Sequence, residues 1–130
     1  MVIVDASVIL ELLLSTSSSV EIQKRLFNQK ETLHAPHLLD LEVAQVLRRY
    51  VVSREMTPER AREALSDFLD IPIRRYPHDL LLDRIWELRS NMTAYDAAYV
   101  VLAELLEAPL ITRDKKLSTA AEHHAQIELI

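Results

Sequence analysis

Three consecutive aliphatic residues near the start of the chain, Val2, Ile3 and Val4, are followed at once by Asp5. A short run that is apolar on both faces is typical of a central strand in a parallel sheet covered by helices on each side. Asp5 then lies at the carboxyl end of that strand, the edge where open α/β sheets bind ligands. The carboxylate could equally be a simple cap for the next helix, whose start Ser7 marks. Whether Asp5 belongs to a binding site depends on which other acids reach this edge.

Short apolar segments alternate with helical segments along the rest of the chain. Further strands are expected at 32–35, 71–76, 110–112 and 126–130. Helices are expected at 7–14, 20–29, 37–54, 58–70, 77–90 and 94–107, with a short one before the last strand. This alternation predicts an α/β protein with a small parallel sheet of about five strands, and Pro72 places the 71–76 strand at an edge. The strandless stretch 37–70 predicts a projecting pair of helices.

Several local signals refine these expectations. Thr57 and Thr93 are placed as N-caps of the helices that follow them. Asn91 is expected to supply the left-handed turn that glycine usually provides, because the chain contains no glycine. Trp86 and the apolar segment 10–14 are assigned to the core rather than to a partner surface.

Length and composition exclude several classes of function. The chain has 130 residues, no cysteine, no glycine and a net charge of −5. One domain spanning 1–130 follows from the length. The lack of cysteine excludes disulfides and Cys-ligated metals, and the lack of glycine excludes glycine-rich phosphate loops. No leader or membrane-spanning apolar run is visible in the sequence, so we expect a soluble, cytoplasmic protein that does not associate with membranes.

Three further acids have neighbours that set them apart. Glu42 and Asp96 carry mostly apolar residues three and four positions away, which places each carboxylate on a core-facing helix stripe. Asp114 follows the strand at 110–112, as Asp5 follows the first strand. Structural alternatives exist for each: Asp114 as a helix cap, Asp96 as a favourable charge in a first helical turn, and Glu42 as the partner of a buried arginine.

Four carboxylates gathered at one sheet edge without an obvious internal cation would be costly to bury. All-oxygen ligation of this kind suits a hard cation, so Asp5, Glu42, Asp96 and Asp114 predict a site for Mg²⁺ or Mn²⁺. The basic residues that bracket the last acid, Arg113, Lys115 and Lys116, are expected at the rim of this site, where a phosphate would approach.

The histidines do not have the spacing of a metal site. His34 and His37 flank Pro36 and cannot share a helix face, while the adjacent His123 and His124 point apart.

Two other families with an aspartate after the first strand can be tested against the sequence. A haloacid-dehalogenase-like phosphatase needs a second aspartate two residues later, where this chain has Ser7. A receiver domain needs a phosphate-accepting aspartate directly after its third strand, but residues 74–78 there are Arg-Arg-Tyr-Pro-His. Both possibilities fail.

Four motifs occur in the order and spacing of a known family. They are Val-Ile-Val-Asp-Ala-Ser at 2–7, Ala-Pro-His-Leu-Leu-Asp-Leu-Glu-Val at 35–43, Thr-Ala-Tyr-Asp-Ala-Ala-Tyr at 93–99 and Pro-Leu-Ile-Thr-Arg-Asp-Lys-Lys-Leu at 109–117. Together they cover essentially the whole chain and resemble PIN-domain proteins, more narrowly the VapC-type toxins of toxin–antitoxin pairs. The departure is the missing glycine, which relatives often place before the third motif and before the fourth strand; it affects loops rather than acids.

This resemblance implies a three-layer α/β/α PIN-like fold and a metal-dependent endoribonuclease that cleaves RNA. It implies that Asp5, Glu42, Asp96 and Asp114 are the catalytic, metal-binding quartet, with Ser7 and Thr112 as supporting hydroxyls. Asp40, two residues from Glu42, belongs to a different helix face and is not carried over. A homodimer and a VapB-type antitoxin are the implied partners. The alternative is a catalytically weak PIN scaffold that binds RNA or protein, although such a scaffold would not need all four acids.

Overall fold

A single five-stranded parallel sheet forms the centre of the computed structural model, which describes residues 1–27 and 30–130. The strands are β1 (Val2–Val4), β2 (Leu33–Pro36), β3 (Ile73–Tyr76), β4 (Leu110–Thr112) and β5 (Ile127–Leu129). Their order is β3-β2-β1-β4-β5, and every neighbouring pair is parallel. The predicted sheet is therefore confirmed, with β1 at its centre and β3 at an edge.

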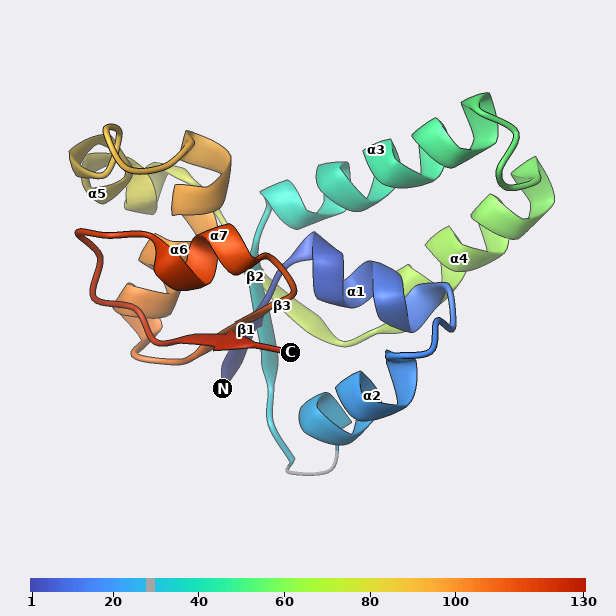
Figure 1. Ribbon diagram of the computed structural model, residues 1–130, viewed down its shortest axis with the longest axis horizontal. Coiled ribbons are helices and arrows are strands. Elements are labelled where there is room, and N and C mark those ends of the chain that lie inside the picture. Colours follow the sequence, from blue (N-terminus) through green and yellow to red (C-terminus); the bar gives the residue numbers. More distant parts are fainter. Residues whose placement is uncertain (28–29) are drawn as a thin grey trace.

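Helices cover both faces of this sheet (Figure 1). They are α1 (Ala6–Leu13), α2 (Ser19–Phe27), α3 (Leu38–Val52), α4 (Pro58–Asp70), the 3₁₀ helix η1 (Asp79–Leu81), α5 (Leu82–Glu87), α6 (Ala94–Leu106) and α7 (Lys115–Thr119). Helix α6 contacts β1, β2 and β4 on one face, and α1 lies on the other. In the described part of the chain, no helix combines the length and the apolar character needed to cross a bilayer.

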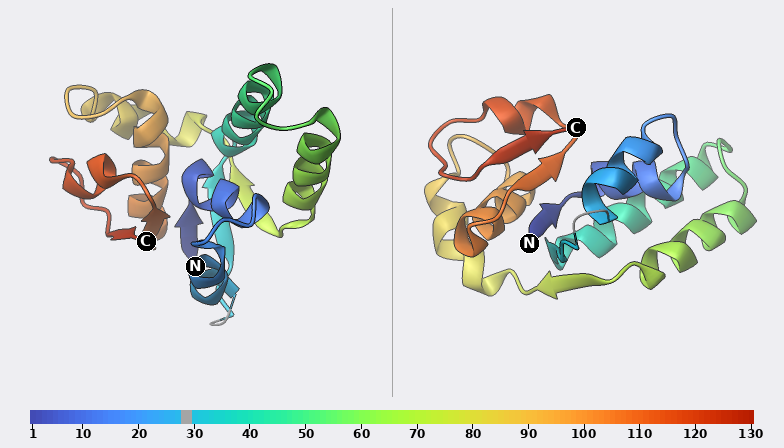
Figure 2. Two further views of the ribbon diagram at one scale, coloured as in Figure 1. Left: turned by 45° about the vertical axis from the view of Figure 1, so that its right-hand side comes forward. Right: turned by 90° about the horizontal axis from the view of Figure 1, so that it is seen from below.

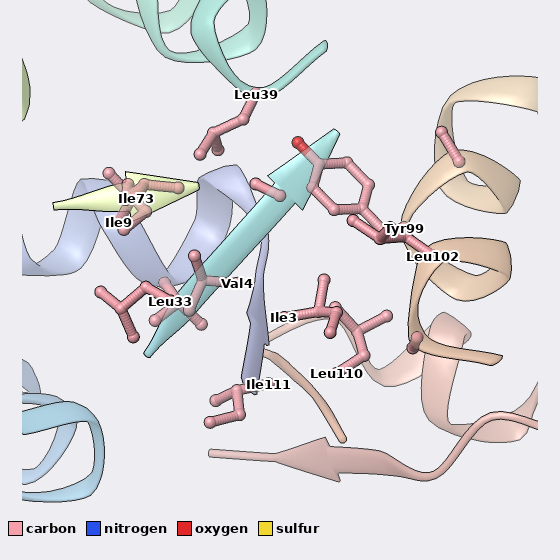
Figure 3. Close-up of a cluster of buried hydrophobic side chains, with 14 of the residues drawn as sticks. Ile3, Val4, Ile9, Leu33, Leu39, Ile73, Tyr99, Leu102, Leu110 and Ile111 are labelled. Carbon is pink, nitrogen blue, oxygen red and sulfur yellow. The ribbon is translucent and has the colours of Figure 1, made fainter. Parts of the chain in front are cut away.

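The core consists of apolar side chains on both faces of the central strand (Figure 3). Ile3 lies on the side of α6, near Leu102, while Val4 lies on the side of α1, near Ile9. All these residues are fully buried. The aliphatic run at 2–4 thus packs against helices in both directions, as expected of a central strand, and holds the start of the next segment in a fixed place at the carboxyl edge.

The helical pair predicted between 37 and 70 is present. Helices α3 and α4 contact each other and extend side by side away from the sheet (Figures 1 and 2). Thr57 caps α4 by accepting the amide N–H of Arg60 at 3.1 Å, and Pro58 occupies the first turn.

Some expected boundaries differ from the structure. Asp5, rather than Ser7, is the N-cap of α1, because Asp5 Oδ1 accepts the amide N–H of Val8. The helix expected at 77–90 is only η1 followed by α5, since the Leu81 amide bonds to the carbonyl of His78 and tightens the first turn. The helix expected at 20–29 ends at Phe27 in the structure, and residues 28–29 lie outside the described part of the chain.

The prediction of a left-handed turn at Asn91 is wrong. Residues with positive φ in the described part are Ser15, Lys30, Arg54, Glu107 and Glu122. Glu107, with φ of 51°, ends α6 in the left-handed conformation, and its amide bonds back to the carbonyls of Ala103 and Glu104. Without glycine, this chain places ordinary residues in a conformation that costs roughly 1–2 kcal/mol for a side chain with a Cβ.

Trp86 was also assigned wrongly to the core. Its side chain is 68% exposed on α5, and the guanidinium of Arg89 lies 4.8 Å from the ring centroid. Helix α5 is short and buries only Ile85, so its outer face has no packing partner within the described residues.

His34, on β2, is a buried titratable group away from the acidic residues. Its Nδ1 lies 2.6 Å from the Tyr76 hydroxyl and its Nε2 lies 2.8 Å from Thr32 Oγ1. Burial lowers the pKa of His34, and the positive charges of the amino terminus and of Arg74 lower it further. The folded protein therefore holds this imidazole neutral at pH values where the unfolded chain begins to protonate it.

We expect His34 to destabilise the protein under mildly acidic conditions. As the pH falls below the unfolded value of about 6.5, only the unfolded chain gains the proton, so the free energy of unfolding decreases by at most about 1.4 kcal/mol per pH unit. The decrease stops below the folded pKa. Between pH 7.5 and 5.5, the parent should lose more stability in urea titrations than His34→Gln, whereas the exposed control His124→Gln should follow the parent. Parallel curves for all three proteins would contradict the assignment.

Candidate active site

Asp5 is a buried carboxylate at the end of the central strand, with only 7% of its surface exposed. Oδ1 accepts the Ser7 hydroxyl at 2.6 Å and the Val8 amide at 3.2 Å, and Oδ2 accepts the Thr112 hydroxyl. A carboxylate oxygen has two acceptor directions, so Oδ2 retains one for a further ligand. Asp5 therefore does cap the next helix, but the cap uses only part of the hydrogen-bonding capacity of its carboxylate.

The two hydroxyls that bind Asp5 also tie β1 to the segment after β4. Ser7 Oγ accepts the amide N–H of Arg113 at 3.1 Å, and Thr112 Oγ1 accepts that of Asp114 at 3.0 Å. Each hydroxyl therefore donates to Asp5 and accepts from a backbone amide of the segment after β4, which fixes its proton on the side of the carboxylate. This network holds the chain after β4 beside the end of β1.

Asp114 is the N-cap of α7 and accepts the amide N–H of Lys116 at 2.9 Å. Its side chain is half-buried. The cap alternative is confirmed here as well. Capping turns this side chain toward the start of α7, at the same sheet edge as Asp5.

Glu42 and Asp96 come from helices on either side of that edge. Glu42 Oε1, on α3, accepts the hydroxyl of Tyr99, which belongs to α6. Asp96 lies in the first turn of α6, where Thr93 Oγ1 accepts its amide N–H at 3.1 Å. Both carboxylates are half-buried. Among residues 1–27 and 30–130 no arginine pairs with Glu42, so the buried-arginine alternative is wrong for the described chain.

The acids influence one another's protonation. Burial raises the pKa of Glu42, and the negative charges of Asp5 and Asp96 raise it further against the opposing bond from Tyr99. Burial and then the charge of Asp114 raise the pKa of Asp96, while Thr93 and Lys116 act in the other direction. Burial raises the pKa of Asp5 despite its hydrogen bonds. The four predicted acids thus form one connected set of like charges.

The carboxylate oxygens of these four acids are the ligands that hard cations prefer. They come from separate elements, repel one another and have no ion-pair partner in the described chain, so a bound cation would relieve their repulsion. In their present side-chain orientations, no three acidic or histidine residues within 1–27 and 30–130 are grouped closely enough to enclose an ion. The sharing of an ion by all four acids remains a prediction.

The basic residues of the expected rim are not equivalent. Lys115 and Lys116 are exposed at the start of α7. The Arg113 side chain already has partners within the protein. Its guanidinium lies 3.6 Å from Glu11 and donates to the carbonyl of Ile130 at 3.2 Å.

Asp40 lies outside the acidic set and pairs with Arg75 at 2.7 Å. This contact agrees with its placement on a different face of α3 from Glu42.

The family of the chain follows from comparison with known proteins. The PIN-domain family model matches residues 2–123, and the chain belongs to that family. Within the family it is a homologue of the VapC ribonucleases: it is 39% identical to ribonuclease VapC12 of Mycobacterium tuberculosis over 130 residues, covering 100% of this chain and 99% of that protein. The resemblance seen in the motifs is thereby confirmed.

Solved structures share the fold. The crystal structure of PAE2754 from Pyrobaculum aerophilum superposes with a TM-score of 0.70 at 25% identity, covering 97% of this chain and 81% of that one. A toxin–antitoxin complex from Klebsiella pneumoniae gives a TM-score of 0.65 at 20% identity, covering 92% and 91%.

The sequence alone predicts no role for Tyr99. The signal was present, because Tyr99 lies three positions after Asp96 and therefore on the same helical stripe. Its partner on α3 is 57 residues away, however, and only the tertiary structure identifies it.

Proposed function

We propose that this chain is a metal-dependent endoribonuclease and the toxin of a toxin–antitoxin pair. The observation that carries the proposal is the position of four carboxylates, Asp5, Glu42, Asp96 and Asp114: two follow the parallel strands β1 and β4, and two lie on the helices α3 and α6. Homology to VapC ribonucleases supports RNA as the substrate.

The four acids would hold Mg²⁺ or Mn²⁺. When bound, such an ion supplies the activation of water and the stabilisation of negative charge during phosphodiester hydrolysis. Ser7 and Thr112 keep the Asp5 carboxylate in one orientation, so its free acceptor direction is prepared before any ligand arrives. In-line hydrolysis at this site would leave a 5′-phosphate and a 3′-hydroxyl.

Exposed lysines would bring RNA to the acids. Lys115 and Lys116 are the better candidates for phosphate contacts, because their ammonium groups face solvent while Arg113 is held by internal partners. The arrangement offsets the net negative charge of the chain locally, at the rim of the acidic site.

A homodimer and a VapB-type antitoxin complete the proposal. The antitoxin partner is supported by the structural similarity to a chain of a toxin–antitoxin complex from Klebsiella pneumoniae.

The direct test is cleavage of RNA by the purified protein. We expect cleavage with Mg²⁺ or Mn²⁺, no cleavage in excess chelator, and recovery when Mg²⁺ is restored, because the acids alone cannot neutralise the developing charge. Mapping of the fragment ends should find 5′-phosphates and 3′-hydroxyls. Undiminished cleavage in chelator would contradict a role for metal.

A further inference from the structure

Tyr99 has an unusual position in the core. Residues 97–103 of α6 are all buried, and Tyr99 is the one among them whose side chain carries a polar atom. It is 3% exposed. Figure 3 shows its ring leaving α6 and its hydroxyl directed toward the carboxyl end of β2, in the region of Leu39 on α3.

The hydroxyl bonds to a carboxylate of the acidic set. A buried hydroxyl must find an acceptor, but a backbone carbonyl would satisfy that need equally well. Here the acceptor is Glu42 Oε1, whose carboxylate also lies in the field of Asp5 and Asp96. The bond therefore links the core of α6 to one particular oxygen of the site.

A neutral donor is the appropriate partner for a carboxylate that must later bind a cation. Lysine or arginine at this position would orient Glu42 but would also cancel the negative charge that attracts the ion. The Tyr99 phenol is uncharged and donates its one proton to this acceptor. In the described chain, no hydrogen-bond donor or ion pair occupies Glu42 Oε2.

We propose that Tyr99 is a positioning residue, which acts through its hydrogen bond to Glu42 Oε1 and leaves Oε2 available to a divalent cation that Asp5 and Asp96 would also bind. The inference rests on the proposed metal-dependent function. Hydrogen bonds to metal ligands typically change metal affinity by 10–100-fold.

The test is the affinity of the folded protein for Mn²⁺, measured by electron paramagnetic resonance or calorimetry. Tyr99→Phe removes one oxygen and should weaken Mn²⁺ binding by roughly 10–100-fold. Cleavage should need correspondingly more Mn²⁺ for half-saturation and should recover largely at saturating Mn²⁺. One lost hydrogen bond costs about 1–2 kcal/mol, well below the stability of a typical domain, so the variant is expected to fold.

Tyr76→Phe is the matched control. Its hydroxyl also bonds to a titratable side chain, His34, but lies away from the acids, and its removal should leave Mn²⁺ affinity unchanged. Parent-like Mn²⁺ binding by Tyr99→Phe would overturn the positioning role. An equal loss of Mn²⁺ affinity in both variants would also overturn it, because it would indicate a general loosening of the packing. A parent protein that binds no Mn²⁺ would instead overturn the proposed function itself.

Discussion

Asp5→Asn is expected to reduce RNA cleavage by about 10³-fold or more without unfolding the protein. Bound metal contributes several kcal/mol to charge stabilisation in the transition state, and every 1.36 kcal/mol corresponds to a tenfold change in rate. Asp5 is the most constrained of the four acids, since Ser7 and Thr112 both donate to it. Asparagine has the same shape and no charge to bury, and its amide nitrogen would cost only the bond from Thr112, so the fold should be retained.

The measurement is a side-by-side comparison of cleavage in vitro and of growth after induction in a bacterial host, with RNA ends mapped. Parent protein should arrest growth, and Asp5→Asn should not. Asp40→Asn is the control, because this aspartate is paired with Arg75 outside the acidic set and a surface ion pair contributes only about 0–1 kcal/mol. Equal toxicity of the parent and Asp5→Asn would reject metal-dependent cleavage and favour a PIN scaffold that acts by binding.

The sequence was most informative where an acid interrupts an apolar run. The strands ending at Val4 and Thr112 are so short that Asp5 and Asp114 can only lie at their carboxyl ends, and parallel pairing of β1 with β4 brings those ends together. Helical spacing sufficed for Glu42, because its apolar neighbours define which side of α3 faces the core. These features depend on local order and on strand direction, both of which a sequence specifies well.

Features that depend on distant packing were not predictable in this way. Trp86 has the character of a core residue, but its burial depends on a partner that α5 does not have within the described chain. No left-handed residue occurs at Asn91, whereas Glu107 takes up that conformation where the chain leaves α6 to enter β4. Tyr99 is an aromatic residue typical of a core, and only the packing of α3 brings Glu42 within hydrogen-bonding distance of its hydroxyl.

The acidic set also makes a prediction about stability. The pKa values of Asp5, Glu42 and Asp96 are raised, with burial as the main cause in each case. The folded protein therefore binds these protons more tightly than the unfolded chain. For these groups, the free energy of unfolding of the metal-free protein is therefore highest at low pH. It decreases as the pH rises above the unfolded pKa values of about 4 and through the folded pKa values. A divalent cation bound to these carboxylates would relieve this penalty.

Mg²⁺ or Mn²⁺ should accordingly raise the melting temperature of the parent at pH 7. At a free concentration about 100 times the dissociation constant, binding adds about 2.7 kcal/mol, which corresponds to roughly 10 °C for a domain of this size. Asp96→Asn removes one of the repelling charges, so it should melt at a higher temperature than the metal-free parent and lose most of the response to metal. Asp67→Asn, at an exposed position on α4, should leave both values unchanged. Scanning calorimetry in chelator and in Mg²⁺ measures all of these quantities, and superimposable curves for the parent would mean that the four carboxylates do not bind a divalent cation.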